Sequence, residues 1–64
     1  MCSSSVFFRR ESAEELILED VMHLVPQASG YRLVGLLGDE KILENARLVE
    51  IDFENNRVVF EPND

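Results

Sequence analysis

The sequence has 64 residues, 13 of them acidic and six basic, which gives a formal charge of −7 at pH 7. A domain of this size buries only about 60% of the surface that its unfolded chain exposes, so we expect a supplement to the core. The lone Cys2 cannot form a disulfide within the chain, which leaves a metal or a partner subunit as that supplement. The negative charge repels phosphate backbones and argues against general nucleic-acid binding.

No segment of the sequence has the pattern of a secretory signal or a membrane span. The first 20 residues lack a basic start followed by an apolar run of about 7–15 residues, and no apolar run approaches the length of about 20 residues that crosses a bilayer. We therefore expect one cytoplasmic domain over residues 1–64.

The apolar residues predict an all-β fold. Short runs rich in Val, Ile, Leu and Phe recur at intervals of about 8–12 residues, separated by polar or glycine breaks, which is the spacing of a small sheet or barrel. We expect strands over residues 4–10, 14–19, 21–26, 30–37, 46–53 and 57–61, with a short extension over 41–43.

Residues 12–22 also admit a helix, because Ser12 and Glu15 have the spacing of a capping box ahead of an apolar run. The apolar triplet 16–18 ends at acidic residues, however, and neither Gly nor Asn follows Met22 to close a last helical turn. These features favour two strands joined by a turn.

Two of the predicted strands are apolar on both faces. In residues 30–37, alternation puts Leu33 and Leu37 on one face. Leu36 lies on the other face, and residues 6–8 are apolar throughout. A sheet with one face in water alternates between apolar and polar residues, so a second surface must be covered by barrel closure or by another subunit. On this basis we predict a homodimer.

The last part of the sequence predicts a β-hairpin. Apolar and charged residues alternate on both sides of Asn55 and Asn56. A two-residue turn there requires positive φ, which Asn tolerates. This turn would pair Phe53 with Val58 and would put the apolar side chains of the two strands on one face.

The sequence offers little for catalysis. It contains one Cys, one His and one Tyr, no arrangement resembling a catalytic triad, and glycines that do not form a phosphate-binding loop. Adjacent carboxylates such as those of Asp39 and Glu40 are typical of a solvated loop. We therefore expect a binding protein and not an enzyme.

Cys2 is the candidate metal ligand, because its position can give it two donor atoms. Removal of Met1 would leave Cys2 with a free α-amine, and the amine and thiolate together would chelate a metal. Both groups release a proton on binding, and their ordinary pKa values lie near enough to neutrality for a divalent cation to displace the protons. Two such chelates form an N₂S₂ set that suits Ni(II) or Cu(II), and Zn(II) and Cu(I) also accept these donors.

His23 and Met22 are the other residues with metal-binding atoms in an apolar stretch. On strict alternation, His23 shares a face with Val21 and Val25. A histidine hydrogen-bonded within the strand and a methionine in the core are the simpler interpretations of the two residues. A supplementary metal-binding role for His23 stays open.

Four features of the sequence, in this order, resemble the CooT family: Met1-Cys2 at the start, Leu-Glu-Asp-Val at 18–21, Gly30 before an apolar strand, and a closing hairpin over 46–52 and 58–61. The resemblance covers essentially the whole chain. It implies a small SH3-like barrel of five to six short antiparallel strands, a homodimer, and nickel binding associated with maturation of carbon monoxide dehydrogenase.

The one functional residue that this resemblance carries over is the family's N-terminal cysteine, which matches Cys2 and would bind nickel at the dimer interface. We therefore predict a cytoplasmic nickel-binding protein that delivers or buffers metal for the maturation of a client metalloenzyme. A metal-independent protein-interaction module is the alternative. Similar sequences have also been labelled predicted RNA-binding proteins, a function that the charge of −7 argues against.

Overall fold

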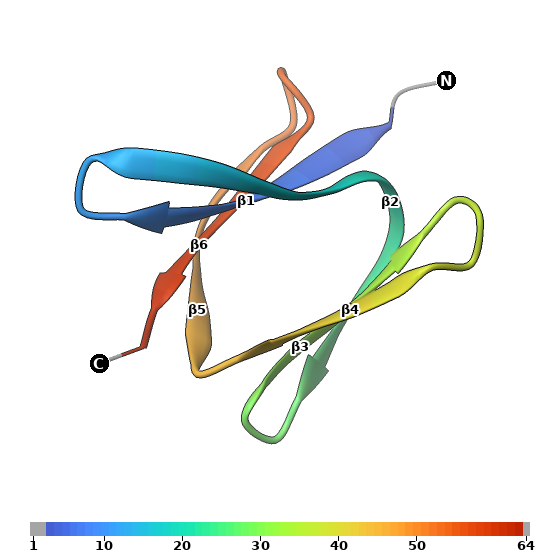
Figure 1. Ribbon diagram of the computed structural model, residues 1–64. Coiled ribbons are helices and arrows are strands. Elements are labelled where there is room, and N and C mark those ends of the chain that lie inside the picture. Colours follow the sequence, from blue (N-terminus) through green and yellow to red (C-terminus); the bar gives the residue numbers. More distant parts are fainter. Residues whose placement is uncertain (1–2, 64) are drawn as a thin grey trace.

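The chain forms six β-strands and no helix within residues 3–63, the part that the computed structural model describes (Figure 1). The strands are β1 (Ser4–Arg10), β2 (Ala13–Gln27), β3 (Gly30–Gly35), β4 (Glu40–Glu44), β5 (Ala46–Asp52) and β6 (Arg57–Pro62). The all-β prediction is confirmed, and the extension expected over 41–43 is a full strand, β4. Within these residues there is accordingly no helix that could span a membrane.

All six strands belong to one sheet, in the order β4-β3-β2-β1-β6-β5. Neighbouring strands are antiparallel except β1 and β6, which pair in parallel, so the first and last strands of the chain lie side by side. A parallel pair needs a long connection, and here the whole intervening chain provides it. The expectation of purely antiparallel strands is wrong for this pair.

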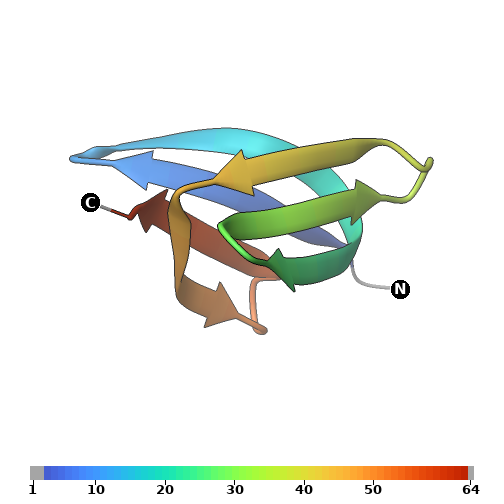
Figure 2. The same ribbon diagram turned by 90° about the horizontal axis from the view of Figure 1, so that it is seen from below.

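The sheet is strongly coiled but is not closed as a barrel (Figure 2). Its two edge strands, β4 and β5, are joined only by Asn45, so the sheet curls until its edges meet at that residue. Asn45 has a φ of 54°, its backbone N–H donates to the Ser29 carbonyl at 2.9 Å, and its carbonyl accepts from Asn63 at 2.8 Å. Among the described residues no ladder joins β4 to β5, so the barrel that we expected stays open along these edges.

A single long strand, β2, replaces the two strands and the turn predicted over 14–26, and the alternative helix over 12–22 does not form. Asp20 has a φ of 54°, and the register slips between Val21 and His23, where β2 changes partner from β1 to β3. Irregularities of this kind bend a strand. The bend lets one strand of 15 residues pass through both halves of the coiled sheet.

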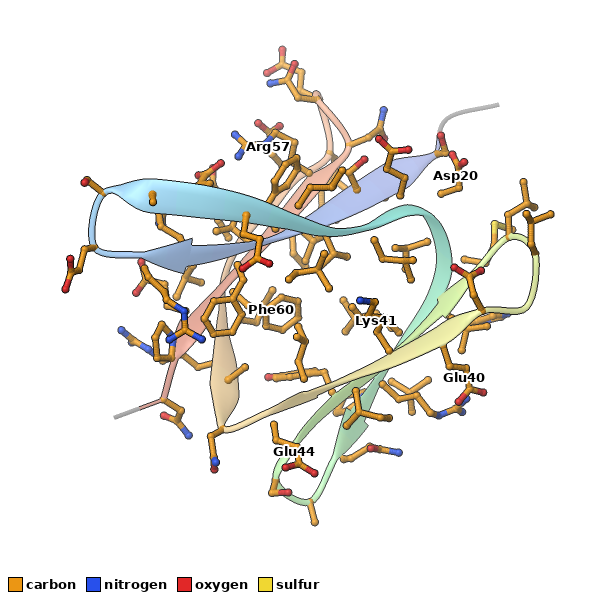
Figure 3. All side chains as sticks on the ribbon, viewed as in Figure 1. Asp20, Glu40, Lys41, Glu44, Arg57 and Phe60 are labelled. Carbon is orange, nitrogen blue, oxygen red and sulfur yellow. The ribbon has the colours of Figure 1, made fainter. Side chains whose placement is uncertain are left out.

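The core is small and comes from alternate residues of the central strands. Val6, Leu33 and Phe60 are fully buried, and the ring of Phe60, near the centre of Figure 3, lies with its centroid 4.8 Å from that of Tyr31. Full burial of a side chain of this kind contributes about 1.5–3 kcal/mol. The other buried residues of this cluster are Phe8, Ala46 and Val58, and the partly buried residues around it are Ile17, Leu18, Val21, Leu24, Tyr31 and Leu43.

The β5–β6 hairpin forms, but its register differs from the predicted one. The turn covers residues 53–56, and Asp52 pairs with Arg57. The predicted two-residue turn and the pairing of Phe53 with Val58 are therefore wrong. The Phe53 side chain, which we expected on the apolar face, is 84% exposed.

The carboxylate of Asp52 accounts for the longer turn. It accepts a hydrogen bond from the Asn55 side chain at 2.9 Å, one from the Asn55 backbone N–H at 3.1 Å and one from the Glu54 backbone N–H at 3.0 Å. Side-chain bonds of this kind stabilise a turn locally, and Asn56 completes it with a φ of 56°. The bond from the Asn55 side chain, followed by the backbone bonds, holds the pKa of Asp52 below its ordinary value.

Acid should loosen this turn. Because the pKa of Asp52 is lower in the folded chain, its stabilising bonds are fully present above the unfolded pKa of about 3.9 and are lost as the pH falls through the folded value. NMR titration should show the amide resonances of Glu54 and Asn55 moving together below that pH. Asp52→Asn keeps an acceptor oxygen but does not titrate, so this variant should show no such transition. If the transition persists in Asp52→Asn, another group controls the turn.

Candidate functional site

The N-terminal end of β1 is the strand end nearest in sequence to the predicted metal ligand. Cys2 itself lies outside the described residues, so its role stays a prediction. Ser4 pairs with Val21 of β2, and the Ser5 backbone N–H donates to the Asn56 carbonyl at 2.9 Å. The start of β1 is therefore held between β2 and the β5–β6 turn.

A shallow pocket of about 140 Å³ opens beside Ser4, over the register slip of β2. Met22 is 50% exposed there, and His23 is exposed. Val21 and Leu24 both pack against the core, so strict alternation is broken between them. We had predicted that His23 shares a face with Val21, but Val21 packs against the core and His23 is exposed. The lining residues are Ser4, Val6, Val21, Met22, His23, Leu24 and Val58.

This corner of the molecule brings an imidazole and a thioether, from His23 and Met22, beside the strand end that leads to Cys2. The prediction that Met22 packs in the core is wrong, because its side chain is half exposed. In residues 3–63 no three His, Cys, Asp or Glu side chains are grouped closely enough to hold a metal ion.

The outer face of the sheet carries a chain of alternating Arg and Glu side chains. Arg57, labelled in Figure 3, binds Glu14, and Glu14 lies 3.7 Å from Arg9. Arg9 binds Glu61 at 3.1 Å, and Arg47 binds the other oxygen of Glu61, also at 3.1 Å. The network joins β1, β2, β5 and β6 through side chains on one surface.

This network covers the apolar outer surface of β1 and β6. The Arg57 guanidinium lies 4.7 Å from the centre of the Phe7 ring, and Val59, which pairs with Phe7, is only 1% exposed. Arginine stems and guanidinium planes cover apolar and aromatic surface well. Side chains of the same chain therefore cover part of the second apolar face of residues 6–8.

The ion pairs also occupy most of the basic residues that RNA binding would need. The remaining pair joins Arg32 and Glu40 at 3.1 Å. Four of the six basic side chains thus lie against carboxylates, where their charge is neutralised locally. Phosphate binding depends on unneutralised Lys and Arg, so the RNA-binding alternative gains no support from this surface.

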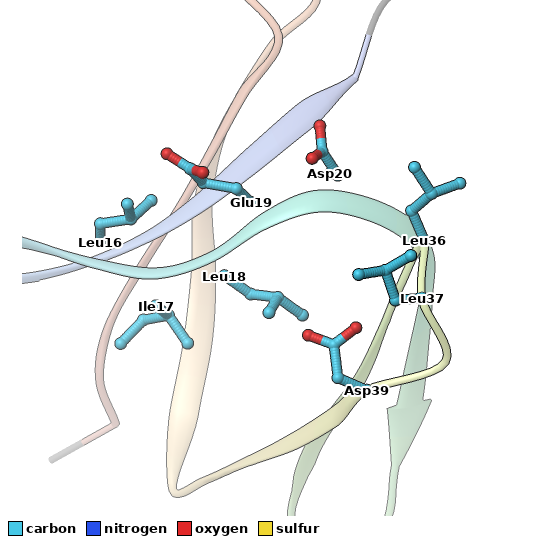
Figure 4. A pocket seen from close by; sticks show the side chains of 8 residues that line it. All are labelled: Leu16, Ile17, Leu18, Glu19, Asp20, Leu36, Leu37 and Asp39. Atoms are coloured by element: carbon cyan, nitrogen blue, oxygen red, sulfur yellow. The ribbon is translucent and has the colours of Figure 1, made fainter.

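A larger groove of about 420 Å³ lies between β2 and the β3–β4 turn (Figure 4). This β2 groove is lined by residues 16–20 of β2 and by Leu36, Leu37 and Asp39 of the turn. Its apolar surface comes from leucine and isoleucine side chains. Its carboxylates are those of Glu19 and Asp20 in β2 and of Asp39 in the turn. Leu36 is 61% exposed and Leu37 is 92% exposed.

This groove was not predicted from the sequence. The strand predicted over 30–37 ends at Gly35, so Leu37 lies in a turn and does not share a sheet face with Leu33. Asp39, interpreted as part of a solvated loop, contributes to the lining. The signal that could have revealed the turn is the pair of glycines, Gly35 and Gly38, on either side of two leucines.

Comparison with known proteins confirms the resemblance inferred from the sequence. The family model described as "CO dehydrogenase accessory protein CooT" matches residues 1–61. The chain is also similar to a crystal structure described as "putative CooT from Carboxydothermus hydrogenoformans", with 30% identity over 98% of this chain and 100% of that chain, and a TM-score of 0.89. No curated protein matches the chain. Since the family model covers nearly its whole length, the chain belongs to the CooT family of CO dehydrogenase accessory proteins, which are not themselves enzymes.

Proposed function

We propose that this protein is a cytoplasmic nickel-binding protein that delivers or buffers Ni(II) during the maturation of CO dehydrogenase. The observation that carries the proposal is the family match over residues 1–61, because that match includes Cys2. In the proposed site, Cys2 from each protomer of a homodimer binds one shared Ni(II) ion at the interface. A reducing compartment keeps a lone thiol of this kind free to bind metal.

The chemistry of Cys2 fits nickel as a cargo. Once Met1 is removed, each Cys2 offers an amine nitrogen and a thiolate, and two such chelates match the square-planar preference of Ni(II). A site divided between two chains opens when the chains separate, which suits a metal that must be released. Copper and zinc accept the same donors, so metal preference belongs in the test.

The surface around Ser4 supports a contact between protomers near the proposed site. Two residues of extended chain span at most about 7 Å, so Cys2 is tied closely to Ser4. Beside Ser4, the half-exposed Met22 and a largely aliphatic pocket present apolar surface to solvent. Burial of this apolar surface in a dimer would supply the stabilisation that a core of this size lacks.

Calorimetric titration of tag-free protein with Ni(II) tests this proposal. We expect one Ni(II) per two chains, with weaker binding of Zn(II). Native mass spectrometry of the same sample should show loss of Met1 and a dimer that carries the metal. A preparation with extra residues ahead of Met1 is the matched control, because it keeps the thiol but lacks the chelating amine, and we expect it to bind more weakly.

Two outcomes would contradict the shared site. Correctly processed protein that does not bind Ni(II) would remove the metal function altogether. Binding of one Ni(II) per chain to a monomer would keep the metal but exclude the bridging arrangement.

A metal-independent interaction module is the second candidate function, and the β2 groove is the observation that favours it. The groove is large, mainly aliphatic and bordered by exposed leucines. Its lining residues differ from those of the pocket beside Ser4, so the two functions are compatible in one molecule.

A further inference from the structure

We propose that the β2 groove docks a polypeptide segment of a different protein, in which a large apolar side chain is followed or preceded by Lys or Arg. The inference goes beyond the proposed nickel function and does not depend on it. It rests on the backbone that forms the groove, on its exposed leucines and on the sign of its charge.

The groove is held in shape by backbone hydrogen bonds. The Leu36 N–H donates to the Asp20 carbonyl at 2.9 Å, which ties the β3–β4 turn to β2. Within the turn, the Gly35 N–H donates to the Asp39 carbonyl at 2.7 Å, and the Gly38 N–H donates to the Gly35 carbonyl at 3.0 Å. A partner therefore meets a groove that is already ordered, which removes one of the usual costs of association.

Gly35 allows the carboxylate of Asp39 to lie close to the backbone of the turn. A Cβ atom at Gly35 would be 2.4 Å from Oδ1 of Asp39, shorter than any normal contact. Figure 4 shows this carboxylate directed toward Leu18 and Leu37. A negative charge is thus placed beside the apolar side chains that a partner would contact.

The leucines of the turn form an apolar surface that the rest of residues 3–63 leaves exposed. Leu37 is 92% exposed and Leu36 is 61% exposed, and both line the groove together with Leu16, which is 46% exposed. Contiguous exposed apolar surface of this kind marks interaction sites in soluble proteins. An apolar side chain of the partner would be buried against these leucines.

Charge decides which partner fits. Glu19, Asp20 and Asp39 line the groove, and none of the five ion pairs among residues 3–63 involves them. These carboxylates repel an acidic segment at the groove, whichever protein supplies it. A basic segment is attracted instead, and its cations would lie against these carboxylates.

Fluorescence anisotropy with labelled synthetic peptides tests the docking site, with a chelator present so that metal plays no part. The probe is a short peptide of alternating leucine and lysine. One control peptide replaces each lysine by glutamate, and the other replaces each leucine by serine. We expect the leucine-lysine peptide to bind, with an affinity that falls as salt is added, and both control peptides to bind at least about tenfold more weakly.

Variants assign the binding to the groove. Leu37→Ser and Asp39→Asn should each weaken binding of the leucine-lysine peptide by about tenfold, since each removes one of the two features that the peptide contacts. Phe53→Ser is the matched control, because Phe53 is also highly exposed but does not line the groove. We expect this variant to bind like the unmodified protein.

The proposal is overturned if Leu37→Ser binds as tightly as the unmodified protein, if the leucine-glutamate peptide binds equally well, or if Phe53→Ser loses as much affinity as Leu37→Ser. Sedimentation provides a separate check. A dimer that becomes a monomer in Leu37→Ser would assign the groove to a second copy of the chain and would also overturn the proposal. The peptide-binding results do not bear on nickel binding, which calorimetry measures independently.

Discussion

Replacing Cys2 with serine is expected to abolish stoichiometric nickel binding while leaving the fold intact. Serine keeps the α-amine but replaces the thiolate by a hydroxyl, which is a poor ligand for Ni(II) at neutral pH. Loss of even an outer-sphere partner of a metal site costs about 10- to 100-fold in affinity, so loss of the thiolate should exceed about 100-fold. Calorimetric titration with Ni(II) measures the loss, and circular dichroism checks the fold.

His23→Ala is the informative comparison for Cys2→Ser. His23 lines the pocket beside Ser4 and is the only histidine of the chain. If Cys2 alone supplies the ligands, His23→Ala should bind Ni(II) with unchanged stoichiometry. Tight stoichiometric binding by Cys2→Ser would sink the proposed site, and loss of binding only in His23→Ala would transfer the ligand role to the histidine.

Phe60→Ala is expected to produce the largest loss of stability of any single truncation in the chain. Phe60 is fully buried and packs on Tyr31 with ring centroids 4.8 Å apart. Truncation of a buried phenylalanine costs about 3–5 kcal/mol. A domain of 64 residues has a total stability of about 3–10 kcal/mol at typical values per residue. This loss is about a third of the total or more, so the variant should be strongly destabilised, and it should be largely unfolded if the domain lies at the low end of that range.

Phe53→Ala is the matched control, since it removes the same side chain from an exposed position. Exposed substitutions of this kind change stability by about 0.5 kcal/mol or less. Urea denaturation of both variants, at one fixed protein concentration because a dimer adds concentration-dependent stability, gives the two values. Equal losses for the two variants would mean that Phe60 is not the centre of the core.

Much of the strand pattern could be predicted from sequence, because apolar alternation reports directly on burial. Five of the six observed strands each match one predicted strand or extension, and β2 replaces two predicted strands. The bounds of β1 are those expected for it. Val6, Phe8 and Leu33, which belong to the apolar runs that predicted β1 and β3, are each at most 7% exposed. These features depend only on neighbouring residues along the chain.

Backbone irregularities were harder to predict, because they depend on contacts between distant strands. Asp20 has a φ of 54° although it is not a glycine. With this conformation β2 continues where a turn was expected. Asp52 closes a turn over residues 53–56, whereas Asn55 and Asn56 alone had suggested a turn of two residues. The longer turn shifts the register of the hairpin. At Asp52 a short acidic side chain, not an apolar one, decides the backbone path.

The two candidate sites differ in what the sequence could reveal. Cys2 was identified from its position and from the family resemblance, and the family is now established. The β2 groove was not predicted, since it joins residues 16–20 to Leu37 and Asp39, which are distant in sequence. The Arg and Glu network was likewise not foreseen, although it explains why residues 6–8 can be apolar on both faces.

The parallel pairing of the first and last strands has a consequence for synthesis of the chain. Ser5 pairs with Arg57 and Phe8 pairs with Phe60, so β1 lacks one neighbour until the residues of β6 have been translated. Contacts of such long sequence separation slow folding. They also leave an apolar strand edge open on the nascent chain, which is a hazard for aggregation. Ser5, which precedes β6 in translation by about 50 residues, gains its partner Arg57 only when β6 has been made, so we expect the strand end that leads to Cys2 to be fully ordered only in a chain that contains β6.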